Sequence, residues 1–150
     1  MEIINRDELM ICGYVVETSV DNCSTELGRL WDDYRNNKSD ELLEAKYRCK
    51  EGLYGLMWYT ENHRYCYLLG REIKSTGVEL PKSKAIKKIP PARYAVYTVP
   101  NNMSVFDAWT VFFEEEIPKE GYEPNAEIGL YFEYYTDKDS NSCQLWAPIR

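Results

Sequence analysis

The chain has 150 residues, the size of one domain, with a formal net charge of −7, five scattered cysteines and a single histidine, His63. The negative charge excludes a general nucleic-acid binder, because phosphate contacts need clustered Lys and Arg side chains. Without a C-x-x-C pair, the cysteines do not indicate a metal site. No apolar run approaches the ~18 residues that a membrane span needs. We therefore expect a cytoplasmic protein without metal, cofactor or membrane contact.

The first half of the chain predicts a strand, a helix and a two-stranded hairpin. Alternating and β-branched residues indicate the strands, and apolar residues at helical spacing after a capping Ser or Thr indicate the helix. The charged stretch 36–50 is only loosely periodic, so a short helix and a loop both stay open there. The expected elements are a strand at residues 11–18, a helix from Ser24 or Thr25 to about Tyr34, and strands at 53–60 and 64–74.

The second half repeats this order after a lysine-rich stretch, residues 76–88. We interpret that stretch as a solvated connector rather than as a basic patch, which divides one domain of residues 1–150 into halves at about 1–75 and 89–150. The expected elements of the second half are a strand at 89–99 with Pro90 and Pro91 at its start, a helix capped by Asn101, Asn102 or Ser104 that ends at Pro118, and strands at 128–136 and 143–149.

Two strand-rich halves with one long helix each predict an α+β domain. We expect a curved, mainly antiparallel sheet with helices on one face and an open ligand cleft on the other. Alternation places Tyr131, Glu133 and Tyr135 on one face of their strand and Phe132 and Tyr134 on the other. Because an acid among apolar neighbours is costly under a helix, we expect Glu133 on the open face and Phe132 and Tyr134 toward the helices.

Six short segments, in this order and spacing, resemble GyrI-like small-molecule-binding domains. These are the effector-binding domains of AraC-type and MerR-type transcription regulators, and they also occur as stand-alone proteins. The segments are LYGLMWY at 53–59, RYCYLLG at 64–70, IPPARYAVY at 89–97, Trp109 followed by IP at 117–118, YFEYY at 131–135 and LWAPI at 145–149.

The resemblance implies two pseudo-symmetric β-α-β-β halves and, between them, a cleft for aromatic and often cationic compounds. It also implies that Glu133 lies at the cleft floor and that the walls come from Trp31, Trp109, Tyr67 and Trp146. No helix-turn-helix precedes the matched region, so we expect a stand-alone domain that does not bind DNA directly.

Other residues near these segments are further candidates, either for the cleft or for the core. Met57 stands in the first half where Glu133 stands in the second, and a flexible thioether suits an adaptable pocket as well as a core gap. Tyr65, Tyr131 and Tyr135 can supply hydroxyl groups to a ligand or simply line the sheet.

Partial burial of Glu133 should raise its pKa, because burial disfavours the ionised carboxylate. A cationic ligand would remove this desolvation penalty, and aromatic faces add cation–π attraction of roughly 0.5–2 kcal/mol each. The first hypothesis is therefore a multidrug-type binder of aromatic or cationic small molecules, acting in sensing or sequestration. The alternative is a hydrolase of cyclopropanoid or other electrophilic xenobiotics with Glu133 as general base, which turnover assays would distinguish. A third hypothesis is a protein-interaction module that inhibits a DNA-handling enzyme.

Overall fold

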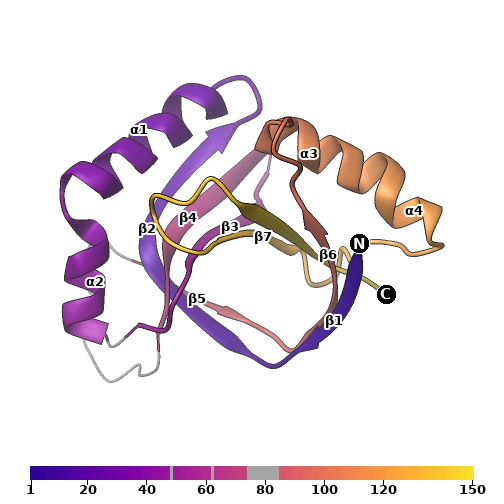
Figure 1. Ribbon diagram of the computed structural model, residues 1–150, viewed down its shortest axis with the longest axis horizontal. Coiled ribbons are helices and arrows are strands. Elements are labelled where there is room, and N and C mark those ends of the chain that lie inside the picture. The colour runs from indigo at the N-terminus through magenta and orange to yellow at the C-terminus, as the bar shows by residue number, and fades with distance from the viewer. Residues whose placement is uncertain (48, 62, 74–84) are drawn as a thin grey trace.

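The central feature of the computed structural model is one antiparallel sheet, whose eight described strands follow the order β1-β6-β8-β7-β3-β4-β2-β5. The structure describes residues 1–47, 49–61, 63–73 and 85–150. Figure 1 shows the sheet curling like an open barrel, with the helices outside it. The strands are β1 (Glu2–Arg6), β2 (Leu9–Ser19), β3 (Leu53–Tyr59), β4 (Arg64–Glu72), β5 (Ala85–Ile89), β6 (Ala92–Thr98), β7 (Leu130–Tyr135) and β8 (Cys143–Pro148).

The two halves meet where β3 pairs with β7, with Leu56 opposite Phe132. On either side of this seam the order β6-β8-β7 mirrors β2-β4-β3, which confirms the expected curved α+β fold built from two similar halves. The edge strands are exchanged between the halves. β1 precedes β2 in the chain but pairs with β6, whereas β5 precedes β6 but pairs with β2. A strand from each half therefore pairs with the outer strand of the other half and satisfies its backbone hydrogen bonds.

Neither β1 nor β5 is among the elements expected from the sequence. β5 begins at Ala85, inside the stretch interpreted as a connector, and the remainder of that stretch, residues 76–84, lies outside the described residues. Pro90 and Pro91 separate β5 from β6 instead of starting one long strand, because proline has no N–H to donate to a sheet.

The helices lie on the outer side of the sheet (Figure 1). α1 (Cys23–Asn36) begins directly after a turn at Asn22, so the predicted caps Ser24 and Thr25 are wrong, whereas Ser104 does cap α3 (Val105–Val111) by accepting the N–H of Asp107. A π-helical turn (Phe112–Glu116) and α4 (Ile117–Lys119) extend α3. No helix in the described ranges is both long and apolar enough to pass through a bilayer.

The charged stretch 36–50, left open between helix and loop, contains α2 (Ser39–Tyr47). Its inner side buries Leu43 and Tyr47. Asp40 ties the helix to its surroundings, because it accepts hydrogen bonds from the Tyr34 hydroxyl at 2.6 Å and from Arg71 at 3.1 Å. These tertiary contacts, rather than a regular spacing of apolar residues, stabilise the helix.

The inside of the curled sheet is a packed aromatic core. Phe132 stacks on Trp146 with ring centroids 5.3 Å apart, and Tyr94 meets both rings edge-on. Tyr134 packs at the border of the same core. The prediction that Phe132 and Tyr134 point toward the helices is therefore wrong. The sheet covers its own concave face by curling, so that face needs no helix.

The hydroxyl of Tyr94 is buried in this core and makes no hydrogen bond within the described residues. Burial raises its pKa to about 12. Because an unmade hydrogen bond of a buried hydroxyl costs about 1–3 kcal/mol, we expect Tyr94→Phe to raise the free energy of unfolding by about 1 kcal/mol in urea denaturation. Tyr54→Phe is the control and should be destabilising, because the Tyr54 hydroxyl accepts a hydrogen bond from Arg6 at 2.9 Å. If Tyr94→Phe instead destabilised the protein, the Tyr94 hydroxyl would have to make a hydrogen bond in the folded state.

Candidate ligand-binding cleft

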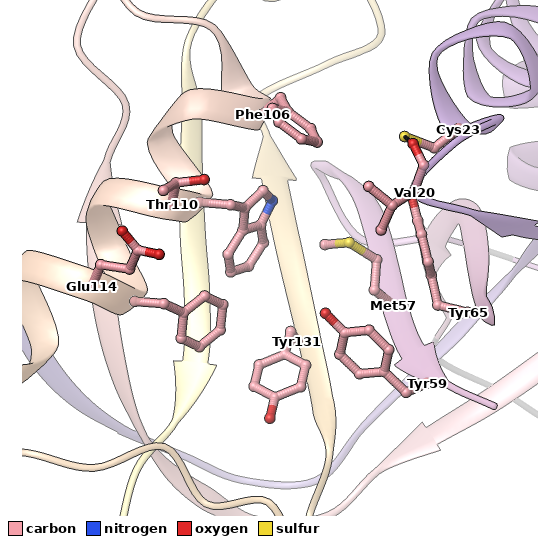
Figure 2. A pocket seen from close by; sticks show the side chains of 11 residues that line it. Val20, Cys23, Met57, Tyr59, Tyr65, Phe106, Thr110, Glu114 and Tyr131 are labelled. Atoms are coloured by element: carbon pink, nitrogen blue, oxygen red, sulfur yellow. Dashed lines mark hydrogen bonds between the residues drawn. The ribbon is translucent and has the colours of Figure 1, made fainter. Parts of the chain in front are cut away.

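A cleft lies between α1 and α3, over β3, β4 and β7. It consists of an inner chamber of about 230 Å³ and an outer chamber of about 320 Å³. In the outer chamber, Figure 2 shows Phe106, Thr110 and Glu114 on the helical wall facing Val20 and Cys23. The two chambers adjoin each other, because they share the lining residues Cys23, Met57, Tyr65, Phe106 and Trp109.

Glu133 lies at the floor of the inner chamber with 6% of its surface exposed. The hydroxyls of Tyr67 and Tyr135 donate to its Oε1 at 2.8 and 2.9 Å, and the indole N–H of Trp109 donates to its Oε2 at 3.0 Å. Trp31 on α1 donates in turn to the Tyr67 hydroxyl at 3.3 Å. The carboxylate is thus linked to both helices and to both halves of the sheet.

The electrostatics of this site are those of a buried acid without a counter-ion. Burial raises the pKa of Glu133 above its ordinary value, although the hydrogen bonds from Trp109, Tyr67 and Tyr135 act in the opposite direction. Burial and the nearby carboxylate raise the pKa values of Tyr67 and Tyr135 strongly, so both remain protonated donors. Within the described ranges, no Lys or Arg forms an ion pair with Glu133.

Gly55 makes room for this hydrogen-bond network. It lies directly opposite Glu133 in the pairing of β3 with β7. A Cβ at this position would overlap the Tyr67 hydroxyl and would lie 2.9 Å from Oε1 of Glu133. A glycine inside a strand often allows such a close approach, and here it leaves space for the side chains on the cleft floor.

Most of the predicted ligand-binding residues line the cleft. Glu133, Trp31, Trp109, Tyr67, Tyr65, Met57 and Tyr135 line the inner chamber, and Tyr131 lines the outer one. The alternation that grouped residues 131, 133 and 135 is confirmed. Their predicted orientation is wrong, because Glu133 faces the helices and bonds to Trp109 of α3. The helices stand apart over the sheet (Figure 1), so Glu133 lies in the space between them, where Trp109 of α3 bonds to it.

Trp146 is the predicted wall residue that lies elsewhere. Its ring stacks on Phe132 inside the curled sheet, and its N–H donates to the side chain of Gln144 at 3.3 Å. The shared face of Gln144 and Trp146 is therefore the concave face of the sheet, whereas Leu145 between them packs near Phe112 on the helix side. The predicted alternation along this strand is confirmed, but the cleft lies on the opposite face from the one expected.

Several cleft residues were not singled out from the sequence. Tyr59 follows Met57 by two positions and so shares its strand face, which the alternation already indicated. The four helical residues Phe106, Thr110, Phe113 and Glu114 follow the spacing of one helix side, but the sequence does not show that this side borders a cavity.

As for metals, the described part of the chain has no group of three or more His, Cys, Asp or Glu able to hold an ion.

A curled antiparallel sheet of two similar halves, with an aromatic cleft and a buried carboxylate between their helices, defines a GyrI-like effector-binding domain. Comparison with known families agrees with this class. The chain belongs to the Cass2 family of integron-associated effector binding proteins, whose model matches residues 2–149. No curated protein matches the chain.

Solved structures share the fold at low sequence identity. SAV2435, determined with bound tetraphenylphosphonium, superposes with a TM-score of 0.74 at 14% identity, over 99% of this chain and 93% of that one. The integron cassette protein VCH_CASS2 from the mobile metagenome of Vibrio cholerae has a TM-score of 0.70 at 16% identity, over 99% and 95%. The C-terminal domain of EcmrR has a TM-score of 0.65 at 8% identity, over 99% and 96%.

Proposed function

We propose that this protein binds aromatic organic cations in the cleft between α1 and α3, with Glu133 as the counter-charge, and that it acts in sensing or sequestration. The observation that carries the proposal is a buried carboxylate held by three neutral donors, with no cation paired to it in the described residues. Membership of an effector-binding family and the tetraphenylphosphonium found in SAV2435 support a ligand of this kind.

The cleft walls suit a delocalised cation. Trp31 meets Tyr135 edge-on with ring centroids 5.0 Å apart, and Trp109 stacks on Phe113 at 5.6 Å. Each aromatic face adds roughly 0.5–2 kcal/mol of cation–π attraction, depending on desolvation. Because the donors on the floor already bind Glu133, the site offers charge and ring faces rather than a set of directional hydrogen bonds. Broad specificity for flat or multi-ring cations follows.

Size-matched ions of opposite charge test the proposal directly. Tetraphenylphosphonium and tetraphenylborate have nearly the same shape, so a merely apolar cleft would bind both. We expect calorimetry to find a single site for the cation and binding of the borate weaker by at least about 100-fold, since every 1.4 kcal/mol is tenfold in affinity. Similar affinities for the two ions would contradict a role for charge in the cleft.

The pH dependence of cation binding provides a second test. Tetraphenylphosphonium does not titrate, and it favours the ionised form of Glu133, whose pKa in the free protein is raised by burial. We therefore expect the affinity to increase as the pH rises toward the raised pKa and to level off above it. A flat calorimetric profile would contradict this assignment, whereas Glu133→Gln should remove the dependence.

The stability of the ligand-free protein should change in the opposite direction over the same pH range. Because the folded-state pKa of Glu133 is raised, its contribution to stability is fully present below the unfolded pKa, about 4.3, and is lost as pH rises through the folded-state pKa. Urea denaturation with and without tetraphenylphosphonium separates the two effects.

A further inference from the structure

A second carboxylate, Glu114, lines the outer chamber of the cleft. It lies on the π-helical turn that extends α3, and its side chain is exposed. Figure 2 shows it beside Thr110 on the helical wall, across the chamber from Met57 and Tyr59. Within the described residues, Glu114 has no ion pair and no hydrogen bond from another side chain. Its charge is therefore available to a molecule in the chamber.

Glu114 lines the outer chamber and Glu133 lines the inner chamber that adjoins it. Trp109 lines both chambers and bonds to Glu133, and Glu114 follows Trp109 by five residues. At 1.5 Å of rise per residue, this places the backbone of Glu114 roughly 7 Å farther along the helix axis. A single small cation at Glu133 would therefore leave the outer chamber, and its carboxylate, without a partner.

A row of aromatic rings begins at Trp109, which bonds to Glu133, and crosses the outer chamber to Tyr59, on the wall opposite Glu114 (Figure 2). Phe113 stacks on Trp109 at 5.6 Å, and Tyr131 meets Phe113 edge-on at 5.4 Å. Beyond them, Tyr59 meets Tyr131 at 6.4 Å and is 69% exposed at the mouth of the chamber. Such a row of rings can contact an extended aromatic ligand along its whole length.

We propose that the cleft takes elongated aromatic dications, with one cationic group near Glu133 and the second near Glu114. This inference rests on the proposed function for the Glu133 end and adds the ligand class to it. The inner chamber holds the more desolvated charge pair, and the outer chamber holds one that water can reach. The second pair should consequently be weaker and more sensitive to salt than the first.

The test compares two ligands and two variants. The ligands are a bis-benzamidine with an alkyl linker and its monocationic analogue, in which a neutral carboxamide replaces one amidine. The variants are Glu114→Gln and Glu115→Gln, because Glu115 is the neighbouring exposed acid that lines neither chamber. Both variants change the net charge equally, and neither position is buried, so both should fold.

We expect the wild type to bind the dication about five- to tenfold more tightly than the monocation at low salt. Glu114→Gln should abolish this preference, whereas Glu115→Gln, which removes the same charge outside the cleft, should retain it. Equal affinities for the two ligands in the wild type would overturn the inference. An equal loss in both variants would also overturn it, since that indicates an effect of net charge. If Glu133→Gln leaves monocation affinity unchanged, the proposed function itself fails.

Discussion

Replacing Glu133 by Gln is expected to weaken tetraphenylphosphonium binding by about 1.5–3 kcal/mol, which is roughly 10- to 150-fold in affinity. The physical reason is that the ligand's charge meets a carboxylate whose own donors, the two tyrosine hydroxyls and the Trp109 indole, are all neutral. Gln keeps the shape of the side chain but removes its charge. Its amide group also replaces an acceptor by a donor, facing groups that already donate. Isothermal calorimetry at neutral pH measures the loss.

Glu72, the other buried acid among the described residues, supplies the matched control. Glu72 is 5% exposed, on the opposite side of the sheet, and is paired with Arg6 at 3.1 Å and with Lys50 at 3.3 Å. Glu72→Gln should lower the stability of the fold, because it leaves Arg6 without its carboxylate, but it should leave cation affinity unchanged. If the two variants lose affinity alike, the effect is structural; if Glu133→Gln loses none, Glu133 is not in the ligand site.

Replacing Gly55 by Ala is expected to lower the free energy of unfolding by about 2–4 kcal/mol and to weaken cation binding as well. The added Cβ would lie 2.6 Å from Cζ of Tyr67 and 2.9 Å from Oε1 of Glu133, which is closer than atoms in contact can approach. Either β3 or both side chains must shift, and the hydrogen bond between Tyr67 and Glu133 breaks. Urea denaturation measures the loss of stability.

A second glycine shows what the same substitution does where space is free. Gly28 lies inside α1, and a Cβ there would meet nothing within 4 Å. Gly28→Ala should therefore stabilise the protein by about 0.5–1 kcal/mol. Adding Tyr67→Phe to Gly55→Ala should recover part of the lost stability, because it removes the hydroxyl that the Cβ overlaps. A Gly55→Ala variant as stable as the wild type would contradict the steric argument.

Local patterns were sufficient for much of the cleft. Alternation along β7 grouped Tyr131, Glu133 and Tyr135, and the structure keeps these residues on one face. The period of two is a property of the strand itself, so it needs no knowledge of the partner strands. The resemblance to a known family placed Trp31 and Trp109 in one cleft with Glu133, although these residues lie far apart in the chain, and it also placed Trp146 there. The helical spacing of Trp31 and Trp109 alone does not decide whether they lie in the core or line the cleft.

Apart from the start of α1, where the caps Ser24 and Thr25 are wrong, the errors concern long-range arrangement. The exchanged strands β1 and β5 pair with the opposite half, which no local signal encodes. The strong curl of the sheet lets its concave face bury Phe132 and Trp146 against one another, and the cleft consequently lies on the helix side. Glu133 would be kept away from the helices only if they covered the whole face of the sheet on which they lie. In the structure they leave a space between them.

The sequence by itself determined the order of the main elements, the residues that share each strand face and the identity of the one acid among aromatic residues. Only the tertiary structure decided which face of the sheet holds the two chambers of the cleft, and that Gly55, Tyr67, Trp109 and Tyr135 converge on Glu133. The reason is physical. Strand alternation and helical spacing arise from bonds within a segment, whereas sheet curvature and the spacing of the helices arise from contacts between segments distant in the chain.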